Sequence, residues 1–172
     1  MKVNESLHKL CSTQINIKNL FGDLGGLLTQ AIRGIPDKFV YTDPNDPSLG
    51  KEKNPHITIL YVLKNGDDYE KMLKDNSIIK RPKLHMTIGK ISVFRFKGEK
   101  PYDVLKAEVS SISLTTLHYY LQANYENENT FPIYKPHVTL SYIKPGTCKE
   151  LEGTWPLDGK RIWTDSFVFT DR

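Results

Sequence analysis

The chain has 172 residues, of which 38% are hydrophobic and 26% are charged, a composition typical of a soluble globular protein with one domain. Its net charge of +4 is compatible with an anionic substrate but is far below that of a protein that wraps nucleic acid. No apolar run could span a membrane, the N-terminus lacks the apolar core of a signal peptide, and Cys11 and Cys148 form no metal-binding or disulfide pattern. We therefore expect a cytoplasmic protein without a membrane partner.

The first half of the chain is predicted to contain three strands and a helix. Alternating β-branched and polar residues predict the strands, at residues 11–17, 56–63 and 84–96. Apolar residues at helical spacing predict a helix from Leu20 to Ile32, with Asn19 as its N-cap. A loop rich in proline and aspartate follows at residues 36–54, and loops of this length are often functional. A further short helix is predicted to start at residues 67–70.

The second half repeats this order. Its strands are predicted at residues 103–109, 136–142 and 162–169. A helix capped by Ser113 separates the first two, and its apolar stripe consists of Leu114, Leu117, His118 and Leu121. We interpret the pattern as the duplication of a strand-helix-strand-strand unit in an α+β fold, with lobes at about 11–96 and 103–169. Antiparallel sheets would then surround a central cleft.

Two seven-residue stretches resemble each other closely. Residues 55–61 are Pro-His-Ile-Thr-Ile-Leu-Tyr, and residues 136–142 are Pro-His-Val-Thr-Leu-Ser-Tyr. Alternate residues of a strand share a face, so each stretch presents a histidine and a threonine together. These pairs are His56 with Thr58 and His137 with Thr139. The same alternation predicts that Ser141 lies on the histidine face and Tyr142 on the apolar face.

A third triplet, His85-Met86-Thr87, has the same pattern on the strand 84–96, which is either one strand or two joined at Gly89. His56 and His137 each follow a proline and each have a tyrosine five residues later, whereas His85 has neither. They also occupy equivalent places in the duplicated unit. We therefore select His56 and His137 as the chemical pair, and leave His85 as either a structural strand residue or a substrate contact on the cleft wall.

Two imidazoles and two hydroxyls facing one cleft suit the cleavage of a ribose phosphodiester by its own 2′-hydroxyl. One neutral histidine would take the proton of that hydroxyl, and one protonated histidine would give a proton to the leaving oxygen. Thr58 and Thr139 would donate to the non-bridging oxygens, where negative charge develops. This chemistry requires no metal, and Asp43, Asp46 and Glu52 have no metal-ligand spacing with the histidines.

Paired His-x-Thr strands about eighty residues apart on a duplicated α+β unit resemble the two-histidine (2H) phosphoesterase superfamily. Three segments are similar to phage-encoded anti-CBASS phosphodiesterases: Ile35-Pro-Asp37 before the loop that leads to the first motif, Ile88-Gly-Lys-Ile-Ser-Val-Phe94 followed by Tyr102-Asp-Val-Leu-Lys106, and Phe131-Pro-x-Tyr-Lys-Pro-His-Val-Thr139. Those enzymes degrade the cyclic di- and trinucleotide signals of bacterial antiviral defence. The resemblance implies a metal-independent enzyme without cofactors, acting on 3′–5′ linkages in the host bacterial cytoplasm. It also implies catalytic roles for four residues, His56, Thr58, His137 and Thr139.

Aromatic residues near the motifs are candidates for stacking on the bases. They are Tyr41 in the long loop, Tyr134 just before the second motif and Trp163 on the closing strand, which is equivalent by duplication to the strand of His85. For each of them, ordinary packing is the competing interpretation. His118 lies on the apolar stripe of its helix and is expected to pack.

Three other functions stay open. One is an RNA-processing relative that acts on 2′,3′-cyclic phosphate ends or 2′–5′ linkages, and another is a module that binds a cyclic nucleotide without cleaving it. A metal-dependent hydrolase is the third. We expect no duplex nucleic acid as a partner, and neither the preferred nucleotide, the initial base nor the oligomeric state follows from the sequence.

Overall fold

A computed structural model of the chain describes residues 11–16, 23–63, 71–72, 74–75, 83–129, 133–164 and 168–171. Within these ranges the fold is α+β, as expected. The strands are β1 (Cys11–Asn16), β2 (His56–Leu63), β3 (Leu84–Phe94), β4 (Asp103–Ser110), β5 (His137–Ile143), β6 (Arg161–Thr164) and β7 (Val168–Asp171). The helices are α1 (Asp23–Arg33) and α4 (Ile112–Asn124), with short 3-10 helices at η3 (Asp37–Phe39) and η4 (Lys149–Leu151).

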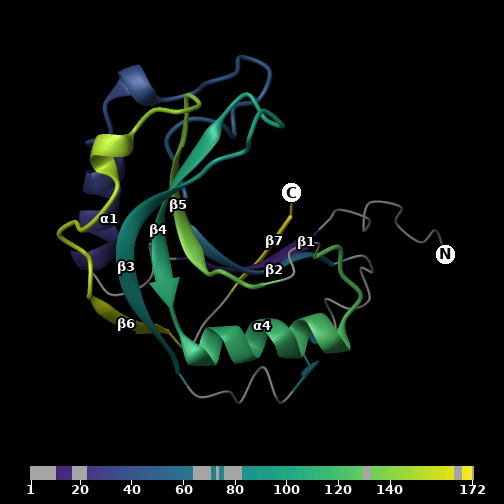
Figure 1. Cartoon of the computed structure of the whole chain (residues 1–172). Coiled ribbons are helices and arrows are strands. Elements are labelled where there is room, and N and C mark those ends of the chain that lie inside the picture. The colour runs from purple at the N-terminus through teal and green to yellow at the C-terminus, as the bar shows by residue number, and fades with distance from the viewer. Residues whose placement is uncertain are drawn as a thin grey trace.

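The described strands form one sheet in the order β6-β3-β4-β5-β2-β1-β7, and every neighbouring pair is antiparallel. The two strands that carry the repeated motif, β2 and β5, are neighbours. Figure 1 shows that the sheet is strongly curved, with α1 beside β3 and α4 lying across its lower end. The two motifs therefore meet near the middle of the sheet although they are far apart in the sequence.

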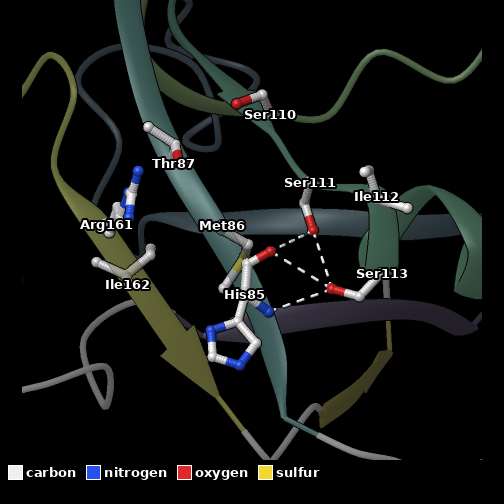
Figure 2. A pocket seen from close by; sticks show the side chains of 9 residues that line it. All are labelled: His85, Met86, Thr87, Ser110, Ser111, Ile112, Ser113, Arg161 and Ile162. Atoms are coloured by element: carbon white, nitrogen blue, oxygen red, sulfur yellow. Dashed lines mark hydrogen bonds between the residues drawn. The ribbon is translucent and has the colours of Figure 1, made fainter.

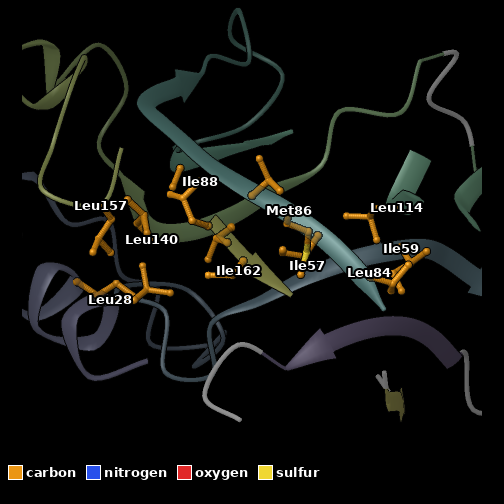
Figure 3. Packing of buried hydrophobic residues seen from close by; sticks show 14 of the residues in the cluster. Leu28, Ile57, Ile59, Leu84, Met86, Ile88, Leu114, Leu140, Leu157 and Ile162 are labelled. Carbon is orange, nitrogen blue, oxygen red and sulfur yellow. The ribbon is translucent and has the colours of Figure 1, made fainter. Parts of the chain in front are cut away.

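One face of the sheet is apolar and the other is partly open to solvent. In β4, Leu105, Ala107 and Val109 are buried while the residues between them are half-buried, which is the expected period of two. Both helices cover the apolar face, and Figure 3 shows Leu28 of α1 and Leu114 of α4 among the buried strand residues. The predicted stripe of α4 is confirmed, because Leu114, Leu117, His118 and Leu121 are all buried. Neither α1 nor α4 covers the half-buried face, so this face can hold a ligand.

The long loop before the first motif packs along the second half of β5. The Tyr41 N–H donates to the Tyr142 carbonyl at 3.0 Å, and the Tyr142 N–H donates to the Gly50 carbonyl at 2.8 Å. Gly50 has a φ of 111°, a conformation that favours glycine. Because this loop occupies the edge of β5 beyond the motif, β2 pairs with β5 at a single position.

A bulge in β5 contradicts part of the predicted alternation. The register with β4 shifts between Thr139 and Ser141, and an extra residue of this kind turns the following side chains to the other face. Ser141 is fully buried, and its hydroxyl donates to the Gly50 carbonyl at 3.2 Å. Tyr142 is half-buried instead, on the face that carries the histidines. The prediction for Ser141 and Tyr142 is therefore wrong.

Other element boundaries also differ from the predictions. The N-cap of α4 is Ser111, whose hydroxyl accepts from the Leu114 N–H at 3.0 Å, rather than Ser113. The single closing strand predicted at residues 162–169 is divided between β6 and β7 on opposite edges of the sheet. Asn19, Leu20 and residues 67–70 lie outside the described residues. None of the helices in the described ranges combines the length and the apolar character needed to cross a membrane.

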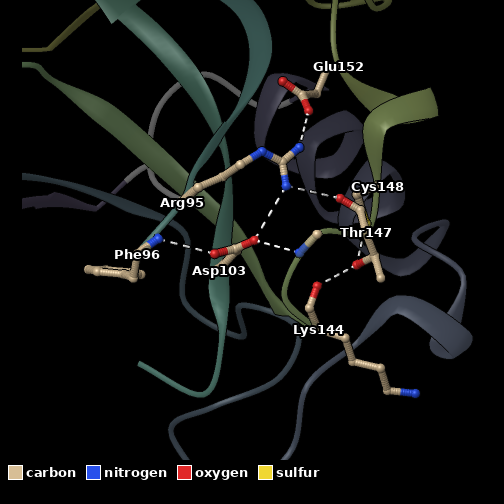
Figure 4. A network of polar contacts seen from close by, with 8 residues as sticks. Arg95, Phe96, Asp103, Lys144, Thr147, Cys148 and Glu152 are labelled. Carbon is tan, nitrogen blue, oxygen red and sulfur yellow. Dashed lines mark hydrogen bonds and ion pairs between the residues drawn. The ribbon is translucent and has the colours of Figure 1, made fainter. Parts of the chain in front are cut away.

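A buried carboxylate joins the start of β4 to the loop after β5. Asp103 is 5% exposed, and its oxygens accept from the Phe96 N–H at 3.2 Å and the Gly146 N–H at 2.9 Å. The Arg95 guanidinium also contacts Asp103, and it pairs with Glu152 as well (Figure 4). These contacts hold together β3, β4 and the segment that leaves β5.

Candidate active site

The single ladder pair between β2 and β5 places the four motif side chains on one face. Ile57 is opposite Val138, and both are fully buried on the apolar face. Their sequence neighbours therefore project from the other face, where all four are half-buried: His56, Thr58, His137 and Thr139. Continuing the antiparallel register by one residue sets each histidine opposite the threonine of the other motif. Opposed Cβ atoms lie about 4.5–5.5 Å apart and diagonal neighbours about 7–8 Å apart, so one phosphate can contact all four.

Both imidazoles are held by the same contact. The Nδ1 atom of His56 lies 2.8 Å from the Asn54 carbonyl oxygen, and the Nδ1 atom of His137 lies 2.8 Å from the Lys135 carbonyl oxygen. A carbonyl oxygen only accepts hydrogen bonds, so Nδ1 carries the proton in each ring. The Nε2 atom of each ring is then the one that can take up or release a proton. The two motifs thus orient their histidines identically, each through the carbonyl two residues earlier.

The threonine hydroxyls are free to donate. Within the described residues, neither the Thr58 hydroxyl nor the Thr139 hydroxyl has a hydrogen-bond partner. The backbone of Thr58 is nevertheless fixed, because its carbonyl accepts from the Tyr134 hydroxyl at 2.8 Å. Two unpaired donors beside two imidazoles can bind the oxygens of a phosphoryl group.

The electrostatic environment of His137 favours its neutral form. Burial lowers the pKa of His137 below its ordinary value, and the positive charges of Lys106 and His56 lower this pKa further, against the opposing effect of the Lys135 carbonyl. His137 is therefore suited to begin a reaction as a base.

Two charged residues on this face were not predicted from the sequence. In β4, Lys106 is opposite Thr139 and Glu108 is opposite His137, so both project beside the motif residues. The alternation predicted for residues 103–109 could have identified them, since Leu105 and Ala107 occupy the apolar face. What the sequence lacked was the pairing of β4 with β5, which brings this face next to the histidines.

The structure assigns Tyr134 to packing within the protein. Its ring stacks on that of His118 with centroids 4.0 Å apart and an angle of 4° between the planes. The His118 Nδ1 contacts the Ile59 carbonyl, and burial lowers the pKa of His118, which is expected for a neutral core histidine. Burial also raises the pKa of the Tyr134 hydroxyl. His118 thus packs as predicted, and Tyr134 contacts both β2, through the Thr58 carbonyl, and α4, through the His118 ring.

His85 and Trp163 lie opposite each other on β3 and β6, at the far edge of the sheet. Trp163 is therefore the direct cross-strand neighbour of His85. The Lys83 ammonium lies 3.5 Å from the centroid of the Trp163 ring. His85 lines an open cavity of about 650 Å³ with Thr87 and Arg161, among others (Figure 2). Figure 2 also shows that Ser111 and Ser113 bond to the backbone of His85.

Tyr41 belongs to an aromatic cluster at the other end of the site. Its ring centroid lies 5.7 Å from that of Tyr102, which lies 5.1 Å from that of Tyr142. Tyr142 shares a face with Val104 and therefore with Lys106, because the two β4 residues are two positions apart. Tyr41 also lines a second cavity of about 520 Å³ with Asp37 and Lys144. Of the predicted substrate contacts, Tyr41 and His85 each line a cavity.

The described residues contain no group of three or more histidine, cysteine, aspartate or glutamate side chains placed to hold a metal ion. Comparisons with known proteins add no assignment, since the sequence matches no protein-family model and no curated protein.

Proposed function

We propose that the protein is a metal-independent phosphodiesterase that cleaves the 3′–5′ linkages of cyclic di- and trinucleotides by attack of the ribose 2′-hydroxyl. The observation that carries this proposal is the matched pair of imidazoles on β2 and β5, each held through Nδ1 by a backbone carbonyl and each beside a free threonine hydroxyl. Such an arrangement supplies a base, an acid and two oxyanion donors around one phosphorus atom.

The lowered pKa of His137 supports the following assignment of the proton transfers. His137 starts neutral, and its Nε2 takes the proton of the 2′-hydroxyl as that oxygen attacks phosphorus. His56 starts protonated and gives its Nε2 proton to the departing 5′-oxygen. The products are a 2′,3′-cyclic phosphate and a free 5′-hydroxyl, so the atoms and protons balance. Thr58 and Thr139 donate to the non-bridging oxygens, whose negative charge rises in the transition state.

The order of the elements supports an internal duplication of the fold. In chain order the elements β1, α1, β2 and β3 are followed by β4, α4, β5 and β6, so the order strand-helix-strand-strand occurs twice. The motif strand is the second strand of each series, and these two strands pair. This supports a duplicated, bilobal 2H phosphoesterase fold with the motifs at the contact between its halves.

The resemblance to anti-CBASS enzymes supports the choice of substrate and the biological role. We propose that the enzyme degrades the cyclic nucleotide signals of bacterial antiviral defence, in the cytoplasm of the host cell if the chain is encoded by a phage. The four motif residues would also serve an enzyme for RNA 2′,3′-cyclic phosphate ends or 2′–5′ linkages, because the reacting atoms are alike. Substrate comparison is therefore the decisive test.

We expect the full chain, incubated in a chelator with a panel of cyclic di- and trinucleotides, to convert at least one of them into linear products ending in a cyclic phosphate. Chromatography with mass detection identifies those products. An RNA oligonucleotide with a 2′,3′-cyclic phosphate end and a 2′–5′ linked dinucleotide serve as the competing substrates. Faster turnover of either competing substrate would assign the RNA-processing function. Recovery of every ligand unchanged would indicate a binding module. Activity that needs added zinc or manganese would indicate a metal enzyme.

The pH dependence of kcat/KM tests the assignment of His137 as the base. Because the base must be neutral, activity falls as the pH drops through the pKa of His137, and that pKa lies below its ordinary value. We therefore expect activity to persist into mildly acidic solution. Lys106→Met removes a charge that lowers this pKa, so the acidic limb of the profile should move to higher pH. If the acidic limb of the Lys106→Met profile does not move over the same pH range, that limb reports the titration of another group.

A further inference from the structure

Among the described residues, one cation beside the motif residues, Lys106, forms no ion pair with a carboxylate. The Lys106 side chain is half-buried on the histidine face of β4, and burial lowers the pKa of its ammonium, with Lys135 and Lys90 adding to this effect and Glu108 opposing it. The positive charges of Lys90 and Lys135 act on Lys106 together with the single negative charge of Glu108, and the excess of positive charge can bind an anion.

The direction of the Lys106 side chain decides which anion it meets. Its Nζ donates to the Ser92 hydroxyl at 3.0 Å, and Ser92 is opposite Lys106 on β3. The ammonium group is therefore drawn toward β3, away from the histidines on β5 and β2. Neighbouring strands are about 4.8 Å apart, so the ammonium lies roughly 10 Å along the sheet from the midline between the two motif strands.

A group at that separation is too far from the reacting phosphorus to bond its oxygens. It can, however, bond an oxygen of a second phosphate that lies between it and the motif residues, because the N–O distance of such a bond is about 2.8 Å. We propose that Lys106, positioned by Ser92, binds a second phosphodiester of the substrate while the first lies between His56 and His137. This inference rests on the proposed function and adds a requirement to it. The preferred substrate must carry a phosphate on each side of one nucleoside, as a cyclic dinucleotide does and an RNA cyclic phosphate end need not.

The site has the composition expected for a phosphate. Lys106 supplies a charged donor that is partly shielded from water, and the Ser92 hydroxyl can turn its own proton toward the ligand while accepting from Nζ. Lys90 and Lys135 are exposed and near enough to influence the charge of Lys106, so they add long-range attraction. Glu108 keeps the cluster from repelling itself when no ligand is bound.

The test compares two ligands that differ in this phosphate. Cyclic di-2′-deoxyadenylate carries two phosphodiesters, and the linear dinucleoside monophosphate d(ApA) carries one; neither has the 2′-hydroxyl needed for cleavage. Their dissociation constants are measured by titration calorimetry on the full chain and on Lys106→Met. We expect Lys106→Met to weaken the cyclic ligand about 10- to 100-fold, the usual loss for a charged hydrogen bond, and to change d(ApA) less than threefold.

Two further variants complete the design. Ser92→Ala should weaken the cyclic ligand by a smaller factor and leave d(ApA) unchanged, because it only frees the ammonium group. Lys149→Met, on the exposed η4, removes an equal charge away from the site and should change neither constant. Equal losses of affinity for both ligands would place Lys106 on the reacting phosphate and overturn the second subsite. The subsite is also overturned if Lys106→Met loses affinity for neither ligand, or if the full chain does not bind the cyclic ligand. Failure of the proposed function is a separate result, namely no turnover of any ribose substrate.

Discussion

Replacing His137 with alanine is expected to lower kcat for a cyclic dinucleotide by about 10²- to 10⁴-fold, because the reaction loses its base. His56→Ala should cause a loss of the same order, since the leaving oxygen then departs without a proton. Neither ring belongs to the buried core, so both variants should fold. Steady-state kinetics with product chromatography measures the loss, and circular dichroism checks the fold.

His85→Ala is the matched control for these two variants. It removes an exposed histidine of the third His-x-Thr triplet. This histidine lies in the same sheet but on β3, which pairs with β6, and not on β2 or β5. Its kcat should stay within about tenfold of the parent value, whether or not KM changes. The mechanism fails if His137→Ala or His56→Ala turns over the substrate at the parent rate, or if His85→Ala loses as much kcat as they do.

Replacing Asp103 with alanine is expected to destabilise the fold by about 3 kcal/mol, because the N–H groups of Phe96 and Gly146 lose their acceptor in a partly buried position. Arg95 contributes less to this loss, since its side chain is 35% exposed and remains paired with Glu152. For a chain of this length, such a loss lowers Tm by about 6–12 °C. Thermal unfolding followed by circular dichroism measures it.

Two control variants accompany the measurement on Asp103→Ala. Asp103→Asn keeps one carbonyl oxygen as an acceptor and should lose less than half as much stability. Glu150→Ala, on the exposed surface of η4 nearby, should change the free energy of unfolding by less than about 0.5 kcal/mol. If Asp103→Ala unfolds at the parent temperature, the contacts drawn in Figure 4 do not support the fold.

The repeated motif was the most informative part of the sequence, because alternation over a few residues depends on backbone geometry alone. It predicted that each histidine shares a face with its threonine, and β2 and β5 have this arrangement. The apolar stripe of α4 was predictable for a similar reason, since Leu114, Leu117 and Leu121 follow the period of a helix.

Alternation failed where a distant segment intervened. The loop at residues 36–54 bonds to the second half of β5, next to the bulge that reverses the faces of Ser141 and Tyr142. The closing segment was divided for a comparable reason, as β6 pairs with β3 and β7 with β1. Neither pairing partner can be read from the residues of the segment itself.

The sequence by itself determined the chemical groups of the site and their local orientation, because strand periodicity sets which side chains share a face. Only the tertiary structure decided that the two motif strands pair, that Lys106 shares their face and that the Tyr134 ring stacks on His118. These outcomes depend on which strands pair and in which register, and that choice is made by burial over the whole sheet, between residues that are far apart along the chain.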